Sequence, residues 1–280
     1  MIIKFFRKAK RATLNLIKYI KAGGLVYVNI AQINYNEILK DKKILITGGS
    51  TGIGYAIAKK MLQEGAKVLI TGRSEDRLQA ASESMKSNSL FYLEWNVKNI
   101  SVVKEKIERV SEILGGIDIV INNAGIVTSA DFERVDEKLF DDIMETNLKS
   151  VFFICQAVAM YYENVNKEKG GKIINISSID GLRSGSNPYY ISKWGINSLT
   201  RGLAKKLISK NIIVNGIAPG YTASNMNPCD VTENAYRQNT PNNRIALPEE
   251  IAEIAVFLAS DATNNIVGQT IVCDGGTTLL

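Results

Sequence analysis

The sequence of 280 residues contains no histidine. This absence excludes every mechanism in which an imidazole is the general base, and it removes the commonest zinc-binding side chain. Acid–base chemistry must therefore come from tyrosine, lysine or carboxylate side chains. Only three cysteines are present, Cys155, Cys229 and Cys273. Their odd number and wide spacing indicate a reducing compartment. No clustered cysteine or carboxylate spacing indicates a metal site.

Long apolar runs are also missing. No stretch reaches the roughly 18 to 20 apolar residues that a membrane-spanning helix needs. Hydrophobic residues nevertheless make up 45% of the chain, which is typical of a globular protein with a full core. We expect an N-terminal extension over residues 1–40 and a single domain over residues 41–280.

Positive charge is concentrated at the N-terminus. Residues 1–36 hold seven of the 34 basic residues and no acidic one, which leaves 27 basic against 28 acidic residues in the rest. The excess belongs to a tail, so a nucleic-acid-binding domain is not indicated. Residues 1–23 have the pattern of a basic amphipathic helix, which predicts peripheral contact with an anionic membrane. Docking on a neighbouring subunit or another protein is the alternative.

From residue 41 onward, apolar strands alternate with helical patterns. Strands that are apolar on both faces predict a parallel sheet covered on both sides. The fold class is therefore α/β, a Rossmann-type doubly wound sheet of about seven strands. The expected strands are 43–47, 67–71, 90–95, 117–121, 172–176, 212–217 and 269–273, with a possible further strand or extended arm at 25–33. The expected helices are 52–63, 74–86, 100–114, 136–164, 190–209 and 248–259.

A glycine-rich turn joins the first strand of this domain to its helix. In Thr47–Gly54, Gly48 permits a tight turn, Gly52 lets the backbone approach a pyrophosphate, and Gly54 lets helix and sheet pack closely. The spacing is Gly-x-x-x-Gly-x-Gly, one residue longer than the common dinucleotide fingerprint. It predicts a phosphate site at the N-terminus of the helix.

About 140 residues further on, Lys193 follows Tyr189 by four residues on an expected helix. An ammonium group beside a phenol favours the phenolate, so the pair can lower the pKa of the tyrosine. Tyr190 is three residues from Lys193 and competes with Tyr189 on geometry alone. Either tyrosine can then move a proton while negative charge develops on a substrate oxygen.

These motifs, in this order, resemble the short-chain dehydrogenase/reductase family, and most closely its 3-oxoacyl-carrier-protein reductase-like branch. The resemblance covers roughly residues 41–280. It rests on the glycine-rich turn, Asn122-Asn123-Ala124-Gly125, Asn147, Ile176-Ser177-Ser178, Tyr189-x-x-x-Lys193, Pro219-Gly220 and Asp274-Gly275-Gly276.

The resemblance implies four catalytic residues. Tyr189 is the proton donor in reduction, and Lys193 lowers its pKa and binds the nicotinamide ribose. Ser178 orients the substrate oxygen, and Asn147 holds a water that links Lys193 to solvent. The loop between Ser178 and Tyr189 is about two residues shorter than in relatives, so Ser177 competes for the serine role.

The cofactor expectation is NADP(H), with NAD(H) possible. Arg73 stands just after the second strand, where NAD-specific sites carry an acid, and a guanidinium suits a 2′-phosphate. A solvated surface charge is the alternative for Arg73. The amide of Asn96, before Val97, replaces the family's usual aspartate at the adenine. The expected cofactor-binding residues are Gly48, Ser50, Thr51, Gly52, Ile53, Gly54, Arg73, Asn96, Val97, Asn123, Ala124, Gly125, Tyr189, Lys193, Pro219, Gly220, Thr222 and Ser224.

The leading hypothesis is a cytoplasmic NADPH-dependent reductase or dehydrogenase that acts on a carbonyl or alcohol. Its substrate is either a 3-oxoacyl thioester or a keto sugar or polyol. The alternatives are a non-catalytic NADP-binding protein and a membrane or partner adaptor on the same fold. Residues 225–243 are expected to form a polar lid over the substrate, in which Asn227, Tyr236, Arg237 and Gln238 can bind polar groups. The resemblance also implies a homodimer or homotetramer, and the tail can place it at the inner membrane surface.

Overall fold

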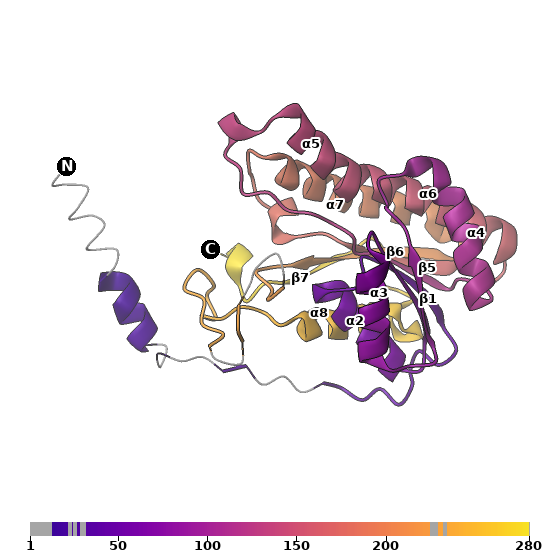
Figure 1. Ribbon diagram of the computed structural model, residues 1–280, viewed down its shortest axis with the longest axis horizontal. Helices are drawn as coiled ribbons and strands as arrows, with labels where there is room; N and C mark the ends of the chain where they lie inside the picture. Colours follow the sequence, from indigo (N-terminus) through magenta and orange to yellow (C-terminus); the bar gives the residue numbers. More distant parts are fainter. Residues whose placement is uncertain are drawn as a thin grey trace.

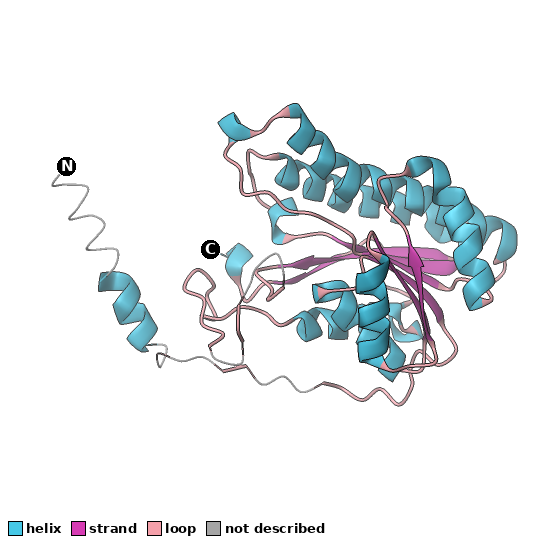
Figure 2. Ribbon diagram, in the orientation of Figure 1, coloured by secondary structure: helices cyan, strands magenta, loops and turns pink. Residues whose placement is uncertain are grey.

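The computed structural model describes residues 13–21, 24, 27–28, 32–224, 229–231 and 234–279. Within this part of the chain, seven parallel strands form one sheet in the order β3-β2-β1-β4-β5-β6-β7 (Figures 1 and 2). The predicted Rossmann-type sheet is therefore confirmed. The strands are β1 Lys43–Thr47, β2 Lys67–Gly72, β3 Leu90–Glu94, β4 Ile119–Asn122, β5 Gly171–Ile176, β6 Ile212–Pro219 and β7 Thr270–Cys273.

Helices cover both faces of the sheet (Figure 1). One buried cluster joins the sheet to α2, α3 and α8, and a second joins it to α4, α6 and α7. β1 serves both, because Ile44 and Ile46 face the first cluster and Leu45 the second. This sharing is why the strands are apolar at consecutive positions. The helices are α2 Gly52–Gln63, α3 Glu75–Met85, α4 Val103–Leu114, α5 Glu137–Met144, α6 Ser150–Val165, α7 Pro188–Leu207 and α8 Pro248–Ala259.

The strand order reverses at β1, and this reversal positions the site. β1 pairs with β2 on one side and with β4 on the other. The connections that leave β1 and β4 therefore diverge to opposite sides of the sheet. In open α/β sheets a crevice forms at such a switch point, outside the carboxyl ends of the strands.

The long helix expected from Asp136 is interrupted. Asp136 caps it as predicted, since its Oδ1 accepts a 2.7 Å hydrogen bond from the Leu139 backbone N–H. A π-helical turn, Glu145–Lys149, then separates α5 from α6. A π turn adds one residue to the helix, and such turns concentrate at functional sites. Asn147 lies in this turn and is buried.

Residues 13–21 are helical, as the amphipathic pattern predicts. The rest of the predicted helix over 1–23 lies outside the described residues. The described residues of 25–33 form no strand. The helix contacts the segment between β6 and α8, where the Tyr19 and Tyr236 rings meet edge to face with centroids 5.1 Å apart. The Gln238 amide also donates to the Asn15 side chain.

Candidate active site

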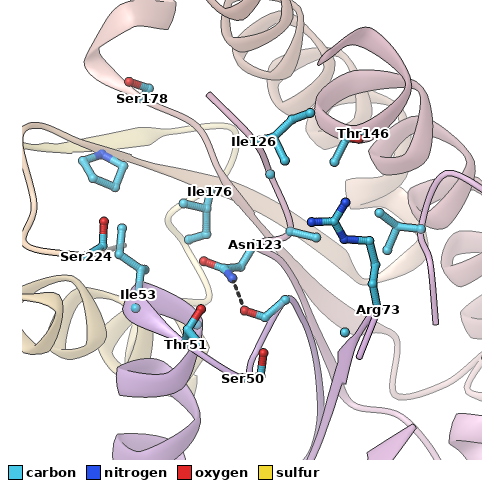
Figure 3. Close-up of a pocket in the computed structure, with 18 of the residues that line it drawn as sticks. Ser50, Thr51, Ile53, Arg73, Asn123, Ile126, Thr146, Ile176, Ser178 and Ser224 are labelled. Carbon is cyan, nitrogen blue, oxygen red and sulfur yellow. Dashed lines mark hydrogen bonds between the residues drawn. The ribbon is translucent and has the colours of Figure 1, made fainter. Parts of the chain in front are cut away.

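A cleft of about 570 Å³ lies at the carboxyl end of the sheet. The loops that follow β1 to β6 all contribute to its lining. In the close-up, Arg73 and Ser178 stand at opposite sides of the view, with Asn123 between them and Ser50 and Thr51 below (Figure 3). The cleft is therefore elongated, with chemically different ends.

The glycine-rich turn forms the floor of the cleft by close backbone packing. A Cβ atom on Gly54 would lie 2.3 Å from the Gly48 carbonyl oxygen and 2.4 Å from the Asn123 amide nitrogen. Gly48 has a φ of +67°, which L side chains rarely adopt. The Asn123 amide donates to the carbonyl oxygens of Thr47 and Gly48, at 3.0 and 2.9 Å, and Figure 3 draws one of these bonds. These contacts fix the turn against the end of β4.

The N-terminus of α2 opens onto this floor. Thr51 is the N-cap residue, and its side chain makes no capping hydrogen bond. The first turn of α2 also contains no acidic residue. The positive end of the helix dipole therefore meets no negative side chain from its own first turn, an arrangement that suits a bound anion.

Two arginines line the end of the cleft beside β2. Arg73 follows the strand directly, and Arg77 lies in the first turns of α3, which Ser74 caps by accepting from the Arg77 N–H at 3.4 Å. Both side chains are exposed. Among the described residues, neither guanidinium lies within 4 Å of a carboxylate. This end is therefore cationic and open to a ligand.

The other end contains Ser178, Tyr189 and Lys193. Ser178 follows β5, and the two others lie in the first two turns of α7. The helix starts at Pro188 rather than at the expected Tyr190, because the Asn187 side chain accepts from the Tyr189 and Tyr190 N–H groups and proline suits the first position. This cap places Tyr189 and Lys193 one turn apart on the cleft side.

The pKa values at this end differ from the expectation that Lys193 lowers the pKa of Tyr189. Burial raises the pKa of Tyr189, while a hydrogen bond with the Ser178 side chain lowers it and the Asp180 charge raises it further. Burial also lowers the pKa of Lys193 to about 8. The Lys193 ammonium donates to the Ile176 carbonyl at 3.0 Å and lies 5.7 Å from the Tyr189 ring centroid. In this arrangement the lysine is held by the backbone rather than by the phenol.

The two alternatives left open by the sequence, Tyr190 and Ser177, have different surroundings from the predicted residues. Tyr190 does not line the cleft, and its ring lies against Gly185. Ser177 lines the cleft, but its hydroxyl donates to the Lys193 backbone carbonyl at 3.3 Å. The Ser178 hydroxyl, by contrast, accepts from the Asp180 N–H at 3.1 Å, and its interaction with Tyr189 lowers the pKa of that phenol. The geometry therefore favours Ser178 and Tyr189 over their neighbours.

Asn147 lies behind the cleft rather than in its lining. Its side chain accepts from the Ile126 N–H at 2.9 Å and donates to the Ile126 carbonyl at 2.8 Å. It also donates to the Ser192 hydroxyl at 3.3 Å. A Cβ on Gly125 would lie 3.4 Å from the Asn147 oxygen and 3.8 Å from the Lys193 nitrogen, so both groups surround this glycine. Asn147 thus ties the loop after β4 to α7.

All 18 residues expected to bind the cofactor line the cleft, together with Ser178. The sequence motifs missed further lining residues. Arg77 carries a detectable signal, since it lies one helical turn beyond Arg73. The others are apolar or small residues without such a signal. The missed residues are Gly72, Ser74, Arg77, Trp95, Ile126 and Thr146, whereas Ile176 and Ser177 also line the cleft and belong to the Ile176-Ser177-Ser178 motif.

Comparison with known proteins agrees with this geometry. A family model described as enoyl-(acyl carrier protein) reductase matches residues 48–278. The 3-oxoacyl-[acyl-carrier-protein] reductase of Chlamydia trachomatis serovar D is 37% identical over 246 residues, which is 85% of this chain and 98% of that protein. The chain belongs to the short-chain dehydrogenase/reductase family. It is therefore an oxidoreductase with a nicotinamide cofactor and a small-molecule substrate.

Other relatives differ in what they act on. Gluconate 5-dehydrogenase of Gluconobacter oxydans is 34% identical over 252 residues, covering 86% of this chain and 96% of that protein. A crystal structure from Agrobacterium tumefaciens, provisionally assigned as a gluconate dehydrogenase, superposes with a TM-score of 0.78 at 30% identity. It matches 86% of this chain and 98% of its own. Among the described residues, no helix is both long and apolar enough to cross a membrane.

Replacing the buried lysine should stabilise the protein at neutral pH. The pKa of Lys193 falls from 10.5 to about 8 on folding, which opposes folding by about 3 kcal/mol below pH 8. Losing the hydrogen bond to the Ile176 carbonyl lowers the free energy of unfolding by about 1 kcal/mol. Lys193→Met should therefore raise the free energy of unfolding by about 2 kcal/mol at pH 7, as measured by urea denaturation.

The pH dependence separates this effect from a general gain in packing. The unfolded chain binds more protons than the folded one between pH 8 and 10.5, so wild-type stability rises across that window. The advantage of Lys193→Met should shrink over the same range. Lys205→Met, which removes an exposed lysine from the same helix, should change stability little at either pH. An advantage that is constant from pH 7 to 10.5 would contradict the prediction.

Proposed function

We propose that the protein is an NADPH-dependent carbonyl reductase whose proton donor is Tyr189. The observation that supports this most directly is the arrangement of the cleft. Ser178, Tyr189 and Lys193 stand together at one end, and Arg73 and Arg77 line the other. An elongated cleft with a proton donor at one end and cations at the other matches a nicotinamide dinucleotide with a 2′-phosphate.

The residues present fit this cofactor. The glycine floor leaves the space that side chains would fill, since a Cβ on Gly52 would lie 3.3 Å from the Ser224 side chain. Gly48–Gly54 and the N-terminus of α2 would hold the pyrophosphate. Arg73 and Arg77 would hold the 2′-phosphate, and Asn96 and Val97 would border the adenine. Lys193 would hold the nicotinamide ribose. When bound, the nicotinamide supplies the hydride in reduction.

The catalytic end can provide the proton. Negative charge develops on the substrate oxygen during reduction, and the Tyr189 and Ser178 hydroxyls can both donate to it. Because burial raises the pKa of Tyr189, the phenol keeps its proton at neutral pH and can deliver it to that oxygen. Asn147 acts through position, because it holds the Ile126 loop and Ser192 behind the reacting residues.

The substrate is proposed to be a 3-oxoacyl thioester or a keto sugar. The Chlamydia relative is named for the first class, and the Gluconobacter relative acts on a sugar acid. NADPH oxidation with a 3-oxoacyl thioester and with a panel of keto sugars tests both directly. Absence of turnover with every carbonyl compound would contradict the proposed function.

Tyr189→Phe should lower kcat by about 10²- to 10⁴-fold, because the proton donor is removed while the ring remains. NADPH binding, followed by fluorescence titration, should change by less than about 2-fold. Tyr190→Phe is the matched control, since the neighbouring phenol lies outside the cleft, and it should keep the wild-type rate. Equal rates in Tyr189→Phe and wild type would exclude Tyr189 as the donor.

The preference for NADP(H) over NAD(H) depends on the two arginines. A charge-assisted contact with a phosphate contributes about 1.5–3 kcal/mol. Arg73→Ala should therefore raise the KM for NADPH by about 10- to 100-fold and leave the KM for NADH within about 2-fold. Arg77→Ala should act in the same direction. Parallel losses with both cofactors would show that the arginines do not contact a 2′-phosphate.

We also propose that residues 1–40 are an extension from an oxidoreductase domain over 41–280, and that residues 1–23 bring it to the inner surface of the cytoplasmic membrane. Its described helix, 13–21, uses Asn15 and Tyr19 to contact the rest of the chain. Leu16, Ile17 and Ile20 remain 58, 44 and 64% exposed. This apolar stripe, with the basic residues of the tail, matches an in-plane membrane helix.

The full chain should sediment with phosphatidylglycerol vesicles and not with phosphatidylcholine vesicles. The double substitution Ile17→Asp and Ile20→Asp should abolish this sedimentation, because it places charge on the apolar stripe. Ile208→Asp, an equivalent change at another exposed isoleucine, should leave sedimentation unchanged. Sedimentation that survives the double substitution would contradict the membrane proposal.

A homodimer or homotetramer through the long helices is proposed as well. α6 and α7 expose large apolar side chains that a neighbouring subunit would cover, among them Phe152, Met160, Ile191 and Trp194, at 46 to 56% exposure. Analytical ultracentrifugation of the full chain measures the assembly directly.

A further inference from the structure

The segment between β6 and α8, residues 221–247, carries the polar residues expected to meet the substrate. Its two ends pair with each other, since the Ala223 N–H donates to the Ala246 carbonyl and the Ala246 N–H to the Tyr221 carbonyl, both at 2.9 Å. Thr222 and Ser224 at its start line the cleft. The segment is therefore anchored at the edge of the catalytic end.

The structure separates the polar residues of this segment into two groups. Tyr236 and Gln238 contact the N-terminal helix, through the ring of Tyr19 and the side chain of Asn15. Arg237, between them, lies instead against Tyr221, with its guanidinium carbon 3.6 Å from the ring centroid. Asn227 lies outside the described residues. Arg237 is thus the member of the group that packs on Tyr221, the residue directly after Gly220 of the cleft lining.

Arg237 keeps its hydrogen-bonding capacity. Stacking on a ring uses the face of the guanidinium and leaves its in-plane N–H groups free to donate. Its Nε is buried without a hydrogen-bond partner. Among the described residues, no carboxylate lies within 4 Å of it, whereas the nearby Arg244 is paired with Glu250 at 2.7 Å. A half-buried guanidinium with an unused donor favours an anionic ligand.

The ring beneath Arg237 leads to the catalytic residues. Tyr221 directly follows Gly220, which lines the cleft. Tyr221 interacts with Arg183, whose guanidinium is paired with Asp180 at 2.6 Å and lies 6.0 Å from the Tyr190 ring centroid. Arg183 belongs to the loop that joins Ser178 to Tyr189. Tyr221 lies between Gly220 and Thr222, which both line the cleft, so Tyr221 and Arg237 lie next to the cleft without being part of its lining.

We propose that Arg237, supported by the Tyr221 ring, binds an anionic group of the substrate. This inference rests on the proposed function and narrows its substrate to carbonyl compounds that carry a carboxylate or a phosphate. The anion can be the carboxylate of a keto sugar acid or the phosphate of a thioester's carrier arm. Arg183 orients Tyr221 and does not attract the anion, because Asp180 neutralises the Arg183 charge.

Calorimetric titration of the full chain with saturating NADPH tests this with two matched ligand pairs. One pair is gluconate and sorbitol, and the other is 4′-phosphopantetheine and pantetheine. With reduced cofactor these alcohols cannot be oxidised, so only binding is measured. The anionic member of at least one pair should bind about 10- to 100-fold more tightly than its neutral counterpart. The pair that shows the difference identifies the source of the anion.

Arg237→Met should abolish that difference and leave the affinity of the neutral ligand within about 3-fold. Arg237→Lys, which keeps the charge but loses the planar fork, should retain part of it. Arg109→Met is the matched control, because it removes an arginine from the exposed face of α4 and changes the net charge equally. Equal affinities within both pairs, no measurable binding of either anion, or a preference that survives Arg237→Met would overturn the inference.

Failure of the Arg237 inference can be distinguished from failure of the proposed function. A protein that reduces carbonyl compounds through Tyr189 but shows no preference for anions would retain the proposed function and lose this inference. A protein that binds the anion through Arg237 but reduces no carbonyl compound would lose the proposed function and keep Arg237 as an anion-binding residue.

Discussion

The cleft depends on one close contact, between the glycine-rich turn and the end of β4. Gly54 packs so tightly against the Gly48 carbonyl and the Asn123 amide that no side chain fits there. The Asn123 amide completes the contact by bonding both carbonyls of the turn. Because the turn is held down in this way, the N-terminus of α2 opens onto the cleft instead of being covered by side chains. The proposed phosphate site follows from backbone packing before any ligand is considered.

The end of the cleft that holds Tyr189 and Lys193 opposes the stability of the fold. Lys193 is buried, and among the residues that the structure describes its ammonium is bonded to a backbone acceptor, the Ile176 carbonyl, and to no carboxylate. Burial shifts the pKa of the lysine down and that of Tyr189 up, so both groups are driven toward neutrality. Such paired shifts are typical of functional sites. The wild-type protein therefore carries an unfavourable buried charge, which packing elsewhere offsets. The same cation would lie close to the negative charge that develops on a substrate oxygen.

The fold and most of the lining residues were predictable because their signals are local. Apolar strands, glycine spacing and the Tyr189–Lys193 interval each depend on a few neighbouring residues. The start of α7 was also readable, from Asn187-Pro188, although the apolar pattern placed it two residues late. The π turn around Asn147 was not predictable, since it arises where α5 and α6 meet the rest of the fold. The lysine's backbone partner and the direction of the Tyr189 pKa shift also depend on burial, which motifs do not encode.

The segment between β6 and α8 is another part of the chain whose contacts could not be predicted from the sequence. Its composition indicated a polar lid over the substrate but did not distinguish the roles of the individual residues. In the structure, Tyr236 and Gln238 face the N-terminal helix, while Arg237 stacks on Tyr221. Tyr236 and Gln238 thus contact the N-terminal helix, and these contacts constrain the backbone of Arg237 between them. The helix over residues 13–21 therefore constrains residues 236–238, even though it lies outside residues 48–278, which the family model matches.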